Sequence, residues 1–491
     1  MEARPSYVLP HPITSPVSIS HLLSSNSAPE GLESRVASAH LAELESQLAP
    51  LEKFMALCSS HHADLIKSIK AHKSILSPIR RLPNELLAEI FMLLVRDAFH
   101  DLNSDSGQIS EYPWVLARVC RHWNVVALGT RTLWSWVFLD LDVIGDEQEA
   151  VAMTQLFHER SGNSPLTVNI VDQSGTDTSD VFNVVLAHAE RWQNFSLTLT
   201  GGSLLALALD GIRGRLDPLT TLQIHAGMSM DETRFALIDS FTTAPNLTAV
   251  HLWVYDSNGR GNFCFPIPLP WSQLTCLSLP LASNEEALSI LPQLSCIVEL
   301  QMVFDGRTDV VPSQNITLSC LRSLEIKERA WDDPPSSFLL NCLTCPILKH
   351  LLTERANPVG AALRFISRSG CSKTLNSFHI LLHPISVDDT LSLVRAMPRL
   401  LVLGVGDFDD GVADSEIVQA LHSHWLSVRD NSETAKLSVQ FMNGQGSGSK
   451  DGDFGALSKD GFFIDIDEFQ ELDSIIDAKY FDYMNVWYLN Q

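Results

Sequence analysis

Apolar residues recur every three or four positions between about residues 32 and 76. This spacing predicts an amphipathic helix with the apolar seam of a coiled coil. The seam positions are Leu41, Leu44, Leu48, Leu51, Met55, Cys58, His62, Leu65, Ile69, His72 and Leu76. Pro50 lies inside the pattern and is predicted to kink or break the helix. Two histidines weaken the seam, so a long helix or helical hairpin packed on the next segment and a homodimer through residues 32–76 both fit.

Residues 77–140 hold a second helical pattern, which begins where Pro83 suits the first turn of a helix. Three apolar stripes at helical spacing follow and predict three short helices. The stripes are Leu86, Leu87, Ile90, Phe91 and Leu94, then Leu116, Val119, Cys120 and Trp123, then Leu133, Trp134 and Trp136. Three short helices in about 60 residues bury too little apolar surface to be stable alone. They therefore share that surface with a partner or with the rest of the chain.

A repeated triplet of apolar residues dominates the next 280 or so residues. Each copy has an apolar residue, then a second three positions later and a third two positions after that, except that the copy at Leu348 ends on Thr353. The copies begin at Trp192, Leu219, Leu247, Leu274, Ile297, Leu321, Leu348, Leu375 and Leu400, which are 23 to 28 residues apart. This period lies in the range of leucine-rich repeats, although the asparagine or cysteine of a regular repeat is not consistently present.

Helical patterns separate these triplets, for example in residues 181–189, 361–367 and 390–397. Pro218, Pro245, Pro346 and Pro398 precede a triplet and end the preceding helix. Alternating strands and helices predict parallel strands with helices on one side. The predicted fold class is therefore α+β/α/β, with an N-terminal helix and three-helix unit followed by an irregular leucine-rich repeat α/β solenoid over residues 141–425.

The segment 77–140 resembles the F-box, in the form found in fungal (basidiomycete-type) F-box-like proteins. The resemblance depends on the order Leu-Pro-x-Glu-Leu-Leu-x-x-Ile-Phe from Leu82, Leu-Ala-x-Val-Cys-x-x-Trp from Leu116, and Leu133-Trp134. It implies a module that docks a Skp-type adaptor and, through it, a cullin-based SCF ubiquitin ligase. The adaptor-binding residues that it implies are Leu82, Pro83, Leu86, Leu87, Ile90, Val119, Cys120 and Trp123. The last three are also expected to hold the helices together.

The resemblance and the repeats together predict a substrate-recognition subunit that binds an unknown protein substrate through its leucine-rich surface. Such a subunit acts by holding the substrate near a ubiquitin carrier and is not itself an enzyme. The alternative is an interaction scaffold outside any ligase, whose F-box has a structural role. An enzyme with a dispersed site on the repeats is a third hypothesis, which no sequence motif favours.

Composition narrows the possible partners and compartments. The net charge is −24, and residues 401–491 alone hold 17 acidic against 5 basic residues. This charge argues against nucleic acid or an anionic membrane as the main partner. Residues 1–30 are rich in serine and proline and are predicted to be disordered. Residues 426–491 are predicted to form an acidic cap, with a strand at 462–467 and an aromatic end at 480–488 that packs back on the repeats. Nine scattered cysteines and the lack of an apolar leader predict the cytosol or nucleus, with no membrane span.

No spacing of residues indicates a catalytic, cofactor or metal site. Cys342 and Cys345 have the spacing of a redox or zinc pair, but no second pair follows at a matching distance. They are interpreted as packing cysteines, and no cofactor or metal is predicted.

Overall fold

The computed structural model describes sixteen stretches of the chain. These are residues 14–100, 112–141, 147–172, 179–199, 209–227, 239–255, 268–281, 284–304, 315–328, 338–353, 359–380, 386–405, 421–423, 425, 437–443 and 462–468. The chain divides into two compact units, residues 1–87 and 88–491. The boundary falls within a helix, α2 (Asn84–His100), and each unit is described by itself.

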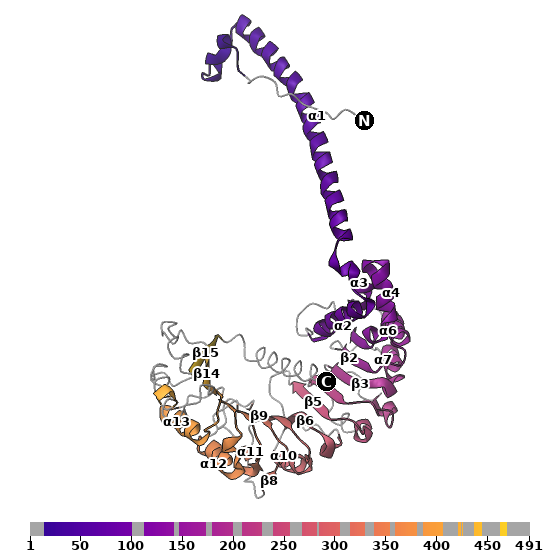
Figure 1. The fold of residues 1–491 in the computed structure, drawn as a ribbon, viewed down its shortest axis with the longest axis vertical. Helices are drawn as coiled ribbons and strands as arrows, with labels where there is room; N and C mark the ends of the chain where they lie inside the picture. Colours follow the sequence, from indigo (N-terminus) through magenta and orange to yellow (C-terminus); the bar gives the residue numbers. More distant parts are fainter. Residues whose placement is uncertain are drawn as a thin grey trace. The chain divides into compact units, whose positions relative to one another are not determined.

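The first unit consists mainly of one long helix (Figure 1). α1 (Gly31–Ile75) begins with a capping box, in which the side chains of Glu30 and Glu33 satisfy each other's backbone N–H groups. The helix continues through Pro50 without a break, so the prediction of a broken helix is wrong. Proline costs about 3 kcal/mol inside a helix, and the 19 residues before it and the 25 after it in α1 sustain the helix on both sides. No residue of α1 is buried.

Short 3-10 helices flank α1. η1 (Val17–Leu23) contains the buried Ile19, and His21 lies 3.5 Å from Glu33 of α1. Residues 14–30 therefore include an ordered turn within the tail that is predicted to be disordered, while residues 1–13 lie outside the described stretches. η2 (Pro78–Arg81) joins α1 to the start of α2.

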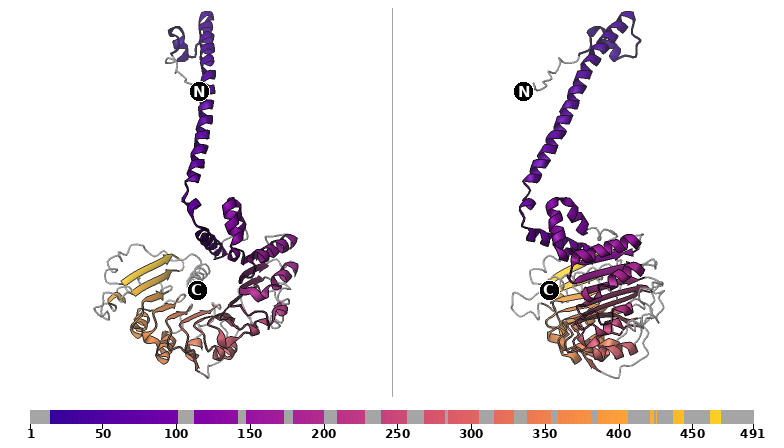
Figure 2. Two further views of the ribbon diagram at one scale, coloured as in Figure 1. Left: turned by 45° about the vertical axis from the view of Figure 1, so that its right-hand side comes forward. Right: turned by 90° about the vertical axis from the view of Figure 1, so that its right-hand side faces the viewer.

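The second unit is an α/β region built on one large parallel sheet (Figures 1 and 2). Its helices are α3 (Tyr112–Val119), α4 (Arg121–Gly129), α6 (Glu147–Ser161), α7 (Ser179–Leu186), α10 (Asn284–Ile290), α11 (Phe338–Cys342), α12 (Val359–Ser369) and α13 (Val387–Ala396). Among its 3-10 helices are η4 (Arg131–Trp134), η6 (Leu209–Ile212) and η7 (Ser240–Thr243). In Figure 1 and in the left view of Figure 2 the helices that follow the strands lie on one side of the sheet.

The described strands of the large sheet pair in sequence order and are all parallel. They are β1 (Trp136–Asp140), β2 (Leu166–Asp172), β3 (Trp192–Leu199), β4 (Thr221–Gly227), β5 (Ala249–Tyr255), β6 (Cys276–Leu281), β7 (Glu299–Phe304), β9 (Ser323–Glu328), β11 (His350–Thr353), β12 (Ser377–Ile380), β13 (Val402–Val405), β14 (Leu437–Asn443) and β15 (Phe462–Glu468). β8 (Ile316–Thr317) and β10 (Leu343–Thr344) form a separate pair. The predicted parallel arrangement is confirmed.

The apolar triplets of the sequence coincide with these strands. Their middle residues stand in one row across the sheet, at Phe195, Leu222, Val250, Leu277, Leu300, Leu324, Leu351, Phe378 and Leu403. Every one of these side chains is buried. Because neighbouring residues of a strand point to opposite faces, the residues between them form a second, more polar face.

The two ends of the sheet lie beyond the predicted repeat boundaries. The third apolar stripe, predicted as a helix, instead forms the turn η4 and then strand β1 from Trp136 onward. The run Val137-Phe138-Leu139 is rich in residues that favour strands, and all three side chains are buried. At the other end, β14 and β15 extend the sheet into the predicted acidic cap, and the strand predicted at residues 462–467 is confirmed. The aromatic stretch 480–488 lies outside the described residues.

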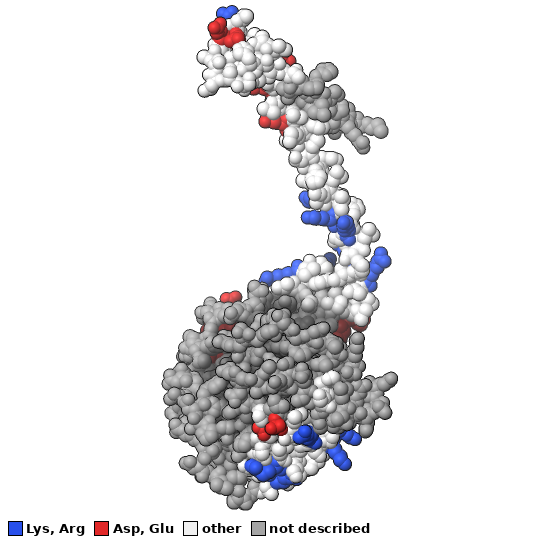
Figure 3. Space-filling model, turned by 90° about the vertical axis from the view of Figure 1, so that its left-hand side faces the viewer, with Lys and Arg blue, Asp and Glu red and all other residues white. Residues whose placement is uncertain are grey.

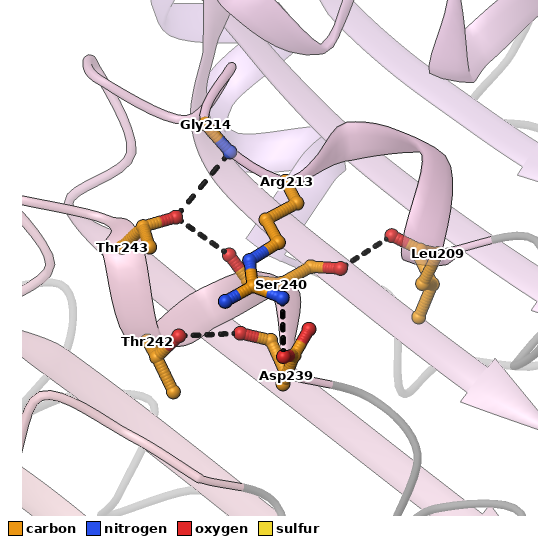
Figure 4. Close-up of polar contacts among 7 residues, drawn as sticks. All are labelled: Leu209, Arg213, Gly214, Asp239, Ser240, Thr242 and Thr243. Carbon is orange, nitrogen blue, oxygen red and sulfur yellow. Dashed lines mark hydrogen bonds and ion pairs between the residues drawn. The ribbon is translucent and has the colours of Figure 1, made fainter.

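Polar contacts join the turns that precede neighbouring strands, η6 before β4 and η7 before β5 (Figure 4). The Ser240 hydroxyl in η7 donates a hydrogen bond to the Leu209 carbonyl in η6, at 2.7 Å. Beside it, Arg213 and Asp239 form an ion pair at 2.6 Å. The two turns, about 30 residues apart in sequence, are thus held together. This is expected when each strand and its connecting segment are stabilised by the neighbouring ones.

None of the described helices could span a bilayer. α1 has the length, but it carries ten charged side chains.

Candidate protein-docking surface

Helix α2 has one buried and one exposed apolar face. Leu87 and Phe91 are completely buried, one helical turn apart. Leu86 is 52% exposed and Ile90 is 37% exposed, and they too are one turn apart. Leu87, which the F-box resemblance implies as an adaptor contact, is therefore an interior residue, whereas Leu86 and Ile90 present their side chains to solvent.

The residues before α2 set where the helix begins. Leu82 has extended backbone geometry and ends η2. Pro83 is exposed, and its carbonyl accepts a hydrogen bond from the Leu87 N–H at 3.1 Å. Leu82 is half-buried. Proline fits this position because a helix leaves its first N–H groups unpaired, so no hydrogen bond is lost.

The second predicted stripe is divided between two helices. α3 ends at Val119, and Cys120 is the N-cap of α4, where its sulfur accepts a hydrogen bond from the Trp123 N–H at 3.5 Å. Asn124 donates a hydrogen bond to the Ala117 carbonyl at 2.9 Å and ties α4 back to α3. Because the chain turns at Cys120, both Val119 and Cys120 are exposed and do not hold the helices together.

Trp123 has the packing role that the sequence suggests for it. It is half-buried, and its ring lies 4.9 Å from that of Phe91, tilted by 57°. This aromatic contact joins α4 to the buried face of α2.

The small helices continue directly into the core of the α/β region. The Trp134 indole N–H donates to the Ala127 carbonyl of α4 at 2.8 Å. The rings of Trp114, Trp134 and Phe157 pack edge to face or tilted, with centroids 4.8 to 6.1 Å apart. The guanidinium of Arg160 lies 4.3 and 4.2 Å from the two tryptophan rings. The helices thus share their core with α6, which explains how such short elements are stable.

Large apolar side chains remain exposed on all three helices of this segment. In addition to Leu86, they are Ile90, Leu93 and Leu94 on α2, Val115 and Val119 on α3, and Val125 and Leu128 on α4. We call these eight residues the apolar helical surface. Leu93, Val115, Val125 and Leu128 were not recognised in the sequence. The sequence could have indicated them, because they are apolar residues at positions outside the apolar stripes that predict the buried helix faces.

Nothing in this surface is suited to chemistry. Its residues are aliphatic and have no titratable group, so they cannot transfer a proton or act as a nucleophile. What such side chains do on helices is contact another apolar surface, because exposed apolar area is favourable to bury. The surface is therefore suited to binding a protein.

The polar face of the sheet brings together the titratable side chains of β4 to β7. Burial lowers the pKa of His225 to about 4 and that of His251 to about 3. The Cys276 sulfur lies 3.9 Å from His251 Nε2 and 3.9 Å from Glu299 Oε2. Burial raises the pKa of the Cys276 thiol and also that of the Glu299 carboxyl. The thiol is therefore protonated at neutral pH and is not an activated nucleophile.

The two cysteines with metal-like spacing are in the core. Cys342 and Cys345 are both fully buried, and burial raises their thiol pKa values to about 11 and about 12. A metal ligand must be a thiolate, so this environment agrees with packing. Across the part of the chain that the structure describes, no cluster of three or more His, Cys, Asp or Glu side chains could hold a metal ion.

Comparisons with known proteins do not assign the chain to a family. No protein-family model matches it, and no curated protein matches it.

Proposed function

We propose that this protein is an F-box-like substrate-recognition subunit of a cullin-type ubiquitin ligase. The apolar helical surface would dock a Skp-type adaptor, and the sheet region would bind a protein substrate. The observation that carries the proposal is the exposure of eight aliphatic side chains on three consecutive helices that each also carry buried apolar residues.

The packing supports a preformed docking module. Phe91 and Trp123 fix α4 against α2, and the Trp134 and Asn124 hydrogen bonds tie α4 to η4 and to α3. The exposed side chains are thus held on rigid elements before any partner binds, which lowers the entropy lost on binding. Insertion of apolar helix faces into a groove of the partner is the binding mode that suits this arrangement.

The polar face of the sheet is the proposed surface for the substrate. It carries one row of polar side chains from neighbouring strands, at Gln223, His251, Ser278, Gln301 and Glu325. His251, Ser278 and Gln301 are buried, and the Ser278 hydroxyl donates a hydrogen bond to the Gln301 side-chain oxygen at 2.5 Å. Gln223 and Glu325 are only half-buried, and they would offer hydrogen-bonding groups to a substrate.

The test is capture of partners by the full-length chain and by an Ile90→Asp, Val119→Asp variant. Both residues are exposed, so the substitutions leave the core intact while placing charge in the docking surface. We expect binding of a purified Skp-type adaptor to weaken by at least about a hundredfold, since burying an unpaired charge costs several kcal/mol. Leu401→Asp, at an exposed leucine near β13, is the matched control and should bind normally.

Mass spectrometry of the complexes formed in cell lysate distinguishes the ligase hypothesis from the scaffold hypothesis. Recovery of adaptor together with cullin supports the ligase role, and recovery of adaptor without cullin supports the scaffold alternative. If the double variant binds the adaptor as well as the unmodified chain does, the docking proposal is wrong.

A further inference from the structure

Helix α1 carries an apolar seam from Leu41 onward that is mostly exposed, with Leu44 and Leu51 half-buried. Seam residues Leu41, Leu48, Met55, Leu65 and Ile69 are 48% to 60% exposed, and every residue from Met55 to Ile75 is exposed. The seam keeps strict alternating steps of three and four residues over five heptads, from Leu41 to Leu76. That is longer than the three to four heptads that indicate a coiled coil.

The charges on α1 are separated along the helix. Residues 31–52 carry four acidic side chains and one arginine, a net charge of −3. Residues 53–75 carry four lysines and one aspartate, a net charge of +3. In Figure 3 the acidic groups of α1 lie mostly toward one end of the helix and the lysines toward the other.

We propose that α1 pairs with α1 of a second copy of this chain as an antiparallel coiled coil. In this orientation the −3 half of each helix lies along the +3 half of its partner. A parallel pair would instead place −3 beside −3 and +3 beside +3, and like charges along a coiled coil select against that orientation. The exposed seam supplies the binding energy, and the charges select the direction.

The spacing of the seam also selects a register. Antiparallel helices pack the two alternating seam positions against each other, which places the two-fold axis between residues 56 and 57. Leu48 of each copy then faces Leu65 of the other, His62 faces Leu51, and His72 faces Leu41. In a parallel pair each histidine would face its own copy. The antiparallel register therefore keeps both seam histidines next to an apolar neighbour.

This pairing has a consequence for the function of the protein. The C-terminal ends of the two α1 helices would lie about 55 Å apart along the axis, since each residue advances the helix by about 1.5 Å. Two recognition regions would be joined in one particle, and a substrate with two binding sites would gain from their high effective concentration. The pairing itself depends on α1 alone and does not require the proposed function.

The experiment measures the mass of the full-length chain in solution by light scattering, at low salt and over a range of concentrations. Glu43→Lys, Glu45→Lys and Glu52→Lys together make both halves of α1 positive. We expect this variant to raise the dimer dissociation constant by about tenfold or more. Adding Lys67→Glu, Lys70→Glu and Lys73→Glu exchanges the signs of the two halves, and we expect it to restore the dimer.

The outcomes separate the possible arrangements. A parallel dimer has like charges side by side before and after the first set of substitutions, so an unchanged dissociation constant overturns the antiparallel arrangement. A monomer at all concentrations overturns the pairing altogether and indicates that a segment of the same chain, or another protein, covers the seam. Because α1 has no buried residue, circular dichroism should show the same helix content in all three proteins.

Discussion

Regularly spaced leucines mark both α1 and the parallel sheet, but the structure places them in opposite environments. Leu48 on α1 is 52% exposed, whereas Leu324 in β9 is 1% exposed. In the sheet, each strand pairs with a neighbour of similar pattern and its helix covers the apolar face. In α1, no part of the described chain buries the seam. The spacing of leucines therefore fixes the type of element, and the presence of a partner within the chain fixes the burial.

The strongest test of this contrast uses the same substitution in both regions. Leu351→Ala in β11 removes a fully buried side chain and should lower the free energy of unfolding by about 2–5 kcal/mol. Leu41→Ala in α1 should change it by less than about 0.5 kcal/mol. Urea unfolding, followed by the sheet signal in circular dichroism at low protein concentration, measures both. Equal effects would mean that the α1 seam is buried within the chain.

A second test concerns a close approach on the polar face of the sheet. Gly404 in β13 stands beside His379 in β12, and a Cβ atom at Gly404 would lie 2.1 Å from His379 Nδ1. Gly404→Ala should therefore displace the imidazole and cost about 1–3 kcal/mol of stability. Gly211→Ala is the matched control, since a Cβ atom there meets nothing within 4 Å.

Combining Gly404→Ala with His379→Ala should recover most of the lost stability, because the small side chain leaves room for the new methyl group. If the double variant is no more stable than Gly404→Ala alone, the cost has another origin than the imidazole contact.

Acid should weaken the sheet region before it weakens α1. His158 in α6 is buried against His188, with ring centroids 4.1 Å apart, and burial lowers the pKa of His158 to about 3. The unfolded chain binds this proton near pH 6.5, so stability is full above pH 6.5 and falls as the pH decreases toward 3. The loss at pH 5.5 is about 1.4 kcal/mol for this group.

Unfolding measured between pH 7.5 and 5 checks the acid effect. His158→Asn removes the titrating group and should flatten the dependence on pH. An unchanged slope in this variant would show that other groups, such as His225 and His251, account for the acid sensitivity.

The smallest effect is expected at the exposed ion pair between Arg213 and Asp239. Its side chains are 57% and 41% exposed, so solvent screens the attraction, and a double-mutant cycle with alanine should give a coupling of about 0.2–1 kcal/mol. A coupling well above this range would mean that solvent screens this ion pair less than its exposure indicates.

Much of the fold could be predicted from the pattern of apolar residues. The triplets locate the strands of the sheet because a strand buried on one face requires an apolar residue at every second position. The helix α1 and the start of α2 at Pro83 were also predictable. The division of the second stripe at Cys120, the change from helix to strand after Trp134, and the strand β14 were not. The break at Cys120 depends on the capping and side-chain contacts of Cys120 and Asn124, and β1 and β14 depend on pairing with strands distant in sequence.

The residues of the candidate docking surface were likewise predicted only in part from the sequence. Leu86 and Ile90 were predicted from the F-box resemblance, and both are exposed. Leu87 belongs to the same predicted group but is completely buried. Two adjacent leucines point about 100° apart on a helix, and only the packed structure decides which of them faces the core.

The sequence by itself determined the order of elements, the parallel connection of the strands and the charge separation along α1. These properties follow from local periodicity and composition, which act over a few residues. Only the tertiary structure decided which apolar side chains remain exposed on α2, α3 and α4, and that the titratable groups of the polar face are buried. Exposure depends on which distant segments pack together, and a pattern along the chain does not specify those contacts.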